Sequence, residues 1–185
     1  MSAELARTAR GMILRELAAM ARMVELYPDD ASLWRDAAGV PNRGGTLVLH
    51  CCGNLRHYVG ARLGGSGYVR DRDAEFTLRG VPKAELLDLI GKTAADVDRA
   101  LAAVRDGDLE GDFPEIVGGQ HVAAREMVMH LCVHLAFHMG QLDYHRRFVT
   151  GDPRSAGAVQ AAELPSARPA TSVSTPLSSV RRPDS

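Results

Sequence analysis

The chain has 185 residues, of which 45% are hydrophobic, enough for one well-packed core, so we predict a single domain over 1–150 followed by a tail over 151–185. A formal net charge of -1 with both signs mixed along the chain gives no basic surface for nucleic acid, and no apolar run approaches the ~20 residues of a membrane-spanning helix. Three cysteines, two of them adjacent, argue against a disulfide framework, and with no secretory leader before the first predicted helix they favour a soluble, cytoplasmic protein.

The first predicted element is a long amphipathic helix over 4–27. Apolar residues recur along it at steps of three and four, which places them on one side of an α-helix, while arginines occupy the other side. Pro28 and the two aspartates after it end the helix. The connection over 31–43 is rich in turn-forming residues, and we expect its Trp34 to be a core residue rather than a ligand-stacking ring.

A second helix is predicted over 46–63, with Thr46 as its N-cap. His50 lies beside the apolar stripe of this helix. Taken alone, a histidine in such a position is more often a hydrogen-bonded core residue than a metal ligand. Cys51 and Cys52 follow directly, and we expect both to be small core residues because Cys52 points away from the His50 side of the helix.

Two further helices follow a charged, irregular segment over 70–80. The third is predicted over 82–105, with Pro82 at its first position, and the fourth begins near residue 121 or 122 and runs to about residue 150. A short extended piece over 112–119 lies between them.

The last 35 residues differ in composition from the rest of the chain. Over 151–185, proline, serine and alanine predominate and the apolar residues show no period, which indicates a tail that is disordered or orders only on a partner. Four long amphipathic segments without a convincing sheet predict an all-α protein, a four-helix bundle.

The fourth predicted helix carries a stripe of histidines. Positions 130, 134, 138, 141 and 145 share one slowly drifting face, and four of these five residues are histidines. Side chains four residues apart rise ~6 Å along the axis and lean the same way, so two imidazoles can reach one metal ion. With His50 as the third nitrogen ligand, His134 and His138 would leave an open coordination position. Spacing alone leaves this reading and chance pairing on a polar face equally open.

Three further polar residues are expected to surround the metal ligands. Asn54 is a candidate partner for the ligand rings, His57 for lining the mouth of the pocket, and Gln141 for a hydrogen bond to a ligand ring. At the end of the stripe, His145, Arg146 and Arg147 are expected to form a solvated helix end.

Two motifs carry a resemblance to a known superfamily. The first is Leu47-Val48-Leu49-His50 with Gly53-Asn54-Leu55-Arg56, and the second is His130-x-x-x-His134-x-x-x-His138-Met139-Gly140-Gln141-Leu142. Together with the charged segment 70–76, they resemble the DinB-like (YfiT-like) metal-binding four-helix superfamily over residues 4–150. The resemblance implies that His50, His134 and His138 bind a divalent metal, zinc or nickel, with His130 nearby as a supporting or alternative ligand.

The same resemblance implies a chemistry. The superfamily includes transferases that use low-molecular-weight thiols such as mycothiol or bacillithiol, so the leading hypothesis is a metal-dependent thiol S-transferase acting on a small-molecule substrate. A metal-dependent hydrolase and a non-catalytic metal-binding stress or scaffold protein are the alternatives. A homodimer is expected, because the first helix carries enough apolar surface for a partner face as well as a core face, including Met12, Met20 and Met23.

Overall fold

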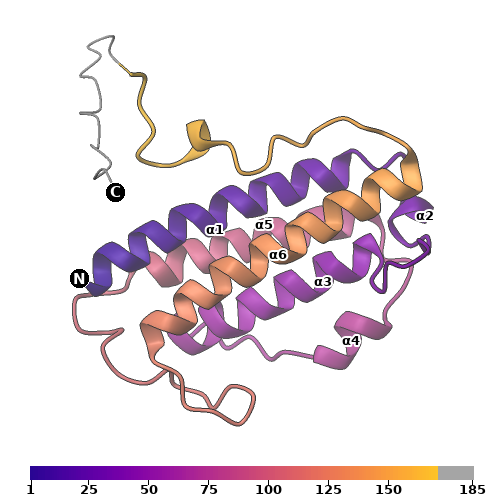
Figure 1. Cartoon of the computed structure of the whole chain (residues 1–185). Helices are drawn as coiled ribbons and strands as arrows, with labels where there is room; N and C mark the ends of the chain where they lie inside the picture. The colour runs from indigo at the N-terminus through magenta and orange to yellow at the C-terminus, as the bar shows by residue number, and fades with distance from the viewer. Residues whose placement is uncertain (171–185) are drawn as a thin grey trace, which may run out of the picture.

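The computed structural model describes residues 1–170, and this part of the chain is helical without a β-strand (Figure 1). The prediction of an all-α protein is confirmed. Four long segments make up most of the structure, and each lies within a few residues of its predicted range: α1 (Ser2–Glu25), α3 (Gly44–Leu55) continued by the π-helical η1 (Arg56–Leu63), α5 (Lys83–Ala102) and α6 (Ala124–Thr150).

These long helices share one hydrophobic core. Both α1 and α3 pack against α5 and α6, so the apolar stripes found in the sequence face inwards together. Met20 and Met23 are buried here, at 1% and 2% exposed, so both belong to the core face of α1 and neither is available to a partner. Among residues 1–170, no helix is both long enough and apolar enough to cross a bilayer.

The start of α3 differs from the prediction. The helix begins at Gly44 with Arg43 as its N-cap, so Thr46 lies inside the helix, buried, and the assignment of Thr46 as the cap was wrong. Glycine is needed at this end because a Cβ on Gly45 would overlap the indole ring of Trp34. Trp34 is half-buried against the core, as expected, and its Nε1–H donates to a backbone carbonyl at 3.0 Å.

Short elements occupy two stretches that were predicted otherwise. Segment 70–80 was expected to be irregular, but it contains α4 (Arg72–Thr77), which is capped by Asp71 through a 2.9 Å hydrogen bond to the Ala74 amide. The extended piece predicted over 112–119 forms only isolated β-bridges at Asp112 and Val117. Two single-turn helices, α2 (Asp30–Leu33) and η2 (Ala161–Glu163), complete the described part of the chain.

The C-terminal end of α6 is buried, and the expectation of a solvated helix end was wrong for two of its three residues. His145 and Arg146 are both 0% exposed. The Nε2–H of His145 donates to the Arg35 carbonyl at 2.9 Å, so its Nδ1 accepts from the Tyr27 hydroxyl at 2.8 Å. Burial lowers the pKa of His145, although the hydrogen bond to Arg35 acts in the opposite direction. The lowered pKa keeps the ring neutral.

The described part of the predicted tail lies against the helices. In Figure 1, residues 151–170 run back along α1. Arg22 of α1 donates to the Ala156 carbonyl at 2.7 Å and pairs with Glu163 at 3.1 Å, and Ala156 itself is buried. The remainder of the tail, 171–185, lies outside the described residues.

Candidate metal centre

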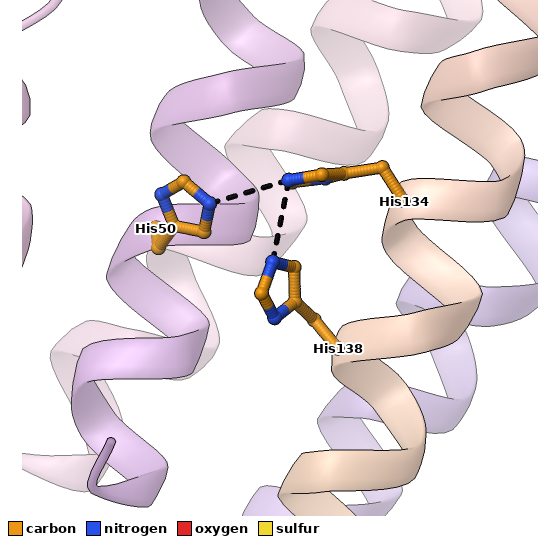
Figure 2. Close-up of side chains that lie close together, drawn as sticks. All are labelled: His50, His134 and His138. Atoms are coloured by element: carbon orange, nitrogen blue, oxygen red, sulfur yellow. Dashed lines mark hydrogen bonds between the residues drawn. The ribbon is translucent and has the colours of Figure 1, made fainter. Parts of the chain in front are cut away.

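Three histidines from two helices meet between α3 and α6. His50 comes from α3, while His134 and His138 project from consecutive turns of α6 (Figure 2). The Nε2 atom of His134 lies 3.4 Å from that of His50 and 3.2 Å from that of His138. One nitrogen of each ring lies within 4.8 Å of the other two. The structure therefore brings His50 to a pair of histidines of which the nearer, His134, is 84 positions away in the sequence.

The spacing of these nitrogens suits a metal ion. Zinc binds imidazole nitrogen at ~2.0 to 2.1 Å, so two such ligands at a tetrahedral angle lie roughly 3.3 Å apart. The 3.2 and 3.4 Å separations found here bracket that value. Three nitrogen ligands with a fourth position open is the arrangement of catalytic rather than structural zinc sites.

The hydrogen bonds of the outer ring nitrogens strengthen this fit. Nδ1 of His50 donates to Glu75 Oε2 at 2.9 Å, and Nδ1 of His138 donates to Gln141 Oε1 at 2.7 Å. In a neutral imidazole only one nitrogen carries a proton, so both Nε2 atoms present lone pairs towards His134. His134 has at most one Nε2–H and cannot satisfy two acceptors. A cation at the centre would satisfy all three rings.

Protonation does not compete strongly for these nitrogens near neutral pH. Burial, together with the neighbouring His138 and His50, lowers the pKa of His134 to about 4. Burial also lowers the pKa of His138, although its hydrogen bond to Gln141 opposes the shift. Metal ligation requires deprotonated imidazole nitrogens, so the rings are held in the form that binds a metal.

Glu75 and Arg70 belong to this centre, and sequence reasoning did not find them. Glu75 is 5% exposed and accepts from Arg70 through both carboxylate oxygens, at 2.6 and 2.7 Å, while it also accepts from His50. Burial raises the pKa of Glu75, but the hydrogen bonds from Arg70 and His50 outweigh it and lower the pKa. The carboxylate stays ionised and fixes the His50 tautomer, the usual role of an acidic partner of a ligating histidine.

The sequence feature that points to the contact between Glu75 and His50 is Gly53. It lies three residues after His50 on the same helix, and a Cβ at this position would overlap the Glu75 carboxylate. The missing side chain thus lets α4 approach α3 closely enough for Glu75 to reach the imidazole.

The other predicted site residues lie around the centre rather than in it. His130 is exposed, and its ring centroid lies 5.9 Å from that of His134, outside the group of three. Asn54 is buried, and its Oδ1 has no hydrogen-bond partner within the described residues. His57 donates to Glu115 at 2.9 Å.

The cysteines next to His50 are core residues, as predicted. Cys51 is 1% and Cys52 is 0% exposed, and neither belongs to the group that could hold a metal. Burial raises the pKa of both thiols, that of Cys52 to about 12, so neither forms a thiolate near neutral pH.

We expect Glu75→Gln to weaken divalent-metal binding about 10- to 100-fold while the fold is kept, because glutamine preserves the shape but removes the charge that orients His50. Competition between the protein and a chelator of known affinity measures this. Glu115→Gln is the matched control, since it alters a carboxylate that accepts from His57 instead. Equal affinities for all three proteins would mean that Glu75 does not support the centre.

Comparison with known families gives one match that spans most of the chain. A family model described as mycothiol-S-transferase matches residues 9–151, which include most of α1, the other three long helical segments and the three histidines. No curated protein and no solved structure matches the chain significantly. The protein therefore belongs to the mycothiol-S-transferase family, within the DinB-like metal-dependent superfamily that its histidine motifs resemble.

Proposed function

We propose that this protein is a metal-dependent thiol S-transferase of the DinB-like four-helix-bundle type, with His50, His134 and His138 as metal ligands. The observation that carries the proposal is the pair of Nε2 lone pairs, on His50 and His138, directed at one point beside His134. The family match supplies the co-substrate class, a low-molecular-weight thiol such as mycothiol. The metal is divalent, and zinc and nickel are the identities we propose because imidazole suits both.

The residues around the centre have defined roles in this reaction. A bound divalent metal would stabilise the thiolate of the co-substrate near neutral pH, with the thiol proton released to solvent. The sulfur would then bond to an electrophilic carbon as the bond from that carbon to its leaving group breaks, and the leaving group would depart with the electron pair. Glu75, fixed by Arg70, holds the His50 ring in the ligating tautomer. Gln141 does the same for His138. Both contacts are made by the protein itself and do not depend on substrate.

Hydrolysis is less well supported because it needs a free general base near the centre. Both oxygens of Glu75 are held by Arg70 and one also by His50, so this carboxylate is not free to accept a proton from water. Asp143 is occupied by Arg146 and Arg147. A thiol co-substrate avoids this requirement, since its sulfur ionises far more readily than water does.

The remaining features of the proposal concern the whole protein. We place the domain boundary near residue 150, where the match to the family model also ends. We further propose a cytoplasmic homodimer, supported by large apolar side chains exposed on α6, such as Val133 at 66% and Phe148 at 68%. Size-exclusion chromatography with light scattering measures the oligomeric state.

Cobalt-substituted protein tests the proposed function directly. We expect titration with mycothiol to add a thiolate-to-cobalt charge-transfer absorption band and to change the d–d bands, because the open position accepts the sulfur. S-methylated mycothiol is the control, since it keeps the rest of the molecule but cannot form a thiolate. Unchanged spectra with both compounds would contradict an exchangeable ligand position and, with it, the transferase.

A further inference from the structure

A pocket of about 400 Å³ opens beside the histidine centre. Its walls come from the loop that precedes α3, from the first turn of α3 and from the C-terminal half of α6. The residues that line it are Gly39, Val40, Pro41, Asn42, Leu47, Phe137, Gly140, Gln141 and Tyr144. Its volume lies in the range of small-molecule sites, roughly 300 to 1,000 Å³.

The pocket adjoins the candidate metal centre at two of its lining residues. Gln141 lines the pocket and also accepts the hydrogen bond from His138 Nδ1 at 2.7 Å. Phe137 lines it as well, and its ring centroid lies 5.4 Å from that of His138. A molecule in the pocket would therefore lie next to the His138 side of the centre.

The chemistry of the walls selects an uncharged, apolar ligand. No lysine, arginine, aspartate, glutamate or histidine lines the pocket, and the side chains that do are mainly aliphatic or aromatic. Asn42 and Gln141 supply the amide groups, and Tyr144 supplies one hydroxyl. Phe137 and Tyr144 are 64% and 65% exposed in the described structure, so they present rings that a flat apolar molecule would cover.

A polar co-substrate does not match these walls. A thiol such as mycothiol carries many hydroxyl and amide groups, each of which must keep a hydrogen-bond partner when it leaves water. The three polar side chains of the pocket are too few to supply these hydrogen-bond partners. The charged side chains near the centre, Arg70 and Glu75, do not line this pocket and belong to the segment that contacts His50.

We propose that this pocket binds the apolar, preferably aromatic, part of the electrophile that accepts sulfur, while the thiol approaches the centre from elsewhere. The inference rests on the proposed function, because it assigns the second substrate of the same reaction. Gln141 then links the two sites, with its amide group contacting the electrophile and its Oε1 holding His138.

Gly140 permits a sharp test of the pocket. It is an exposed residue inside α6 that lines the pocket, and a Cβ built on it would have no atom within 4 Å. A Cβ at residue 140 therefore fits without a clash, and Gly140→Met places an apolar side chain at the wall of the pocket. The change also replaces a helix-destabilising residue by a good helix former. Gly91→Met is the matched control, an exposed helical glycine on α5 with equally open surroundings.

Two measurements on full-length protein apply to both variants. Binding of 1,3-dinitrobenzene, an unreactive aromatic, to metal-free protein is followed by NMR shifts of the Gln141 side-chain amide. Steady-state transfer from mycothiol to 1-chloro-2,4-dinitrobenzene gives a KM for each substrate. We expect Gly140→Met to weaken aromatic binding and to raise the KM for the aromatic electrophile at least about 10-fold, because the methionine occupies the apolar volume. The KM for the thiol and the values for Gly91→Met should stay within about twofold of those of the unmodified protein.

Three results would overturn the assignment. A raised KM for the thiol in Gly140→Met would place the thiol in the pocket, and unchanged constants for both substrates would leave the pocket without a role in the reaction. A change of oligomeric state in Gly140→Met alone would make the pocket part of an interface between copies. If the proposed transferase function is wrong, the cobalt spectrum does not change with thiol even though the protein still binds the aromatic compound, so this outcome is distinguishable from the other three.

Discussion

Replacing His134 by alanine is expected to remove stoichiometric divalent metal and to abolish thiol transfer. His134 is the central ligand of the candidate set, since its Nε2 lies within 3.4 Å of those of both His50 and His138. Metal binding by four-ligand protein sites is worth about 10–16 kcal/mol, or about 2.5 to 4 kcal/mol for each ligand. Loss of one ligand should therefore weaken affinity about 10²- to 10³-fold, which elemental analysis after dialysis and chelator competition both measure.

His130→Ala is the control for this experiment. The residue lies on the same face of α6, one turn before His134, but it is exposed and outside the group of three. Its replacement should leave the metal content at the level of the unmodified protein. If His130→Ala loses the metal as completely as His134→Ala, the ligand set derived from the geometry is wrong.

Arg146→Ala is expected to lower the free energy of unfolding by about 3 to 5 kcal/mol, because it removes one member of a buried charged network. The Arg146 side chain is 0% exposed and donates to the Asp143 carboxylate at 2.8 Å. It also donates to the backbone carbonyls of Asp152 at 3.1 Å and Arg154 at 2.5 Å. The variant removes the donor to the Asp152 and Arg154 carbonyls, while Asp143 keeps its contact with Arg147, and it frees the chain that follows α6. Urea denaturation should show the lower stability, and limited proteolysis should cut first in segment 151–170.

Arg147→Ala separates burial from charge. This neighbouring arginine also donates to Asp143, at 2.7 Å, and to a carbonyl of the same segment, that of Pro153, at 2.8 Å, but its side chain is 35% exposed. Water can replace its contacts, so we expect a loss of less than about 1 kcal/mol. Similar losses in the two variants would show that burial of Arg146 is not what stabilises this end of the molecule.

The C-terminal end of α6 is buried, although the sequence predicted a solvated helix end. The histidine stripe and the length of the helix follow from a local period. Whether the end of a helix faces water depends on what covers it, and here Tyr27, the Arg35 carbonyl and segment 151–170 cover His145 and Arg146. Basic residues near a helix C-terminus are usually solvated, and nothing in their own neighbourhood in the sequence shows the exception.

The helices could be predicted from the sequence, whereas the contacts of Glu75 and the apolar pocket could not. Helix period is a local property of the chain, so the sequence predicts the all-α class, the four long helical segments and a shared face for His134 and His138. His50 lies 84 positions before His134, and the resemblance to a known superfamily added it to the set. Only the tertiary structure decided that Glu75 and Arg70 hold His50, and that an apolar pocket opens beside His138. Both depend on how α4 and the loop before α3 settle against helices distant in the sequence, where close approach is governed by side-chain shape and by single glycines such as Gly53.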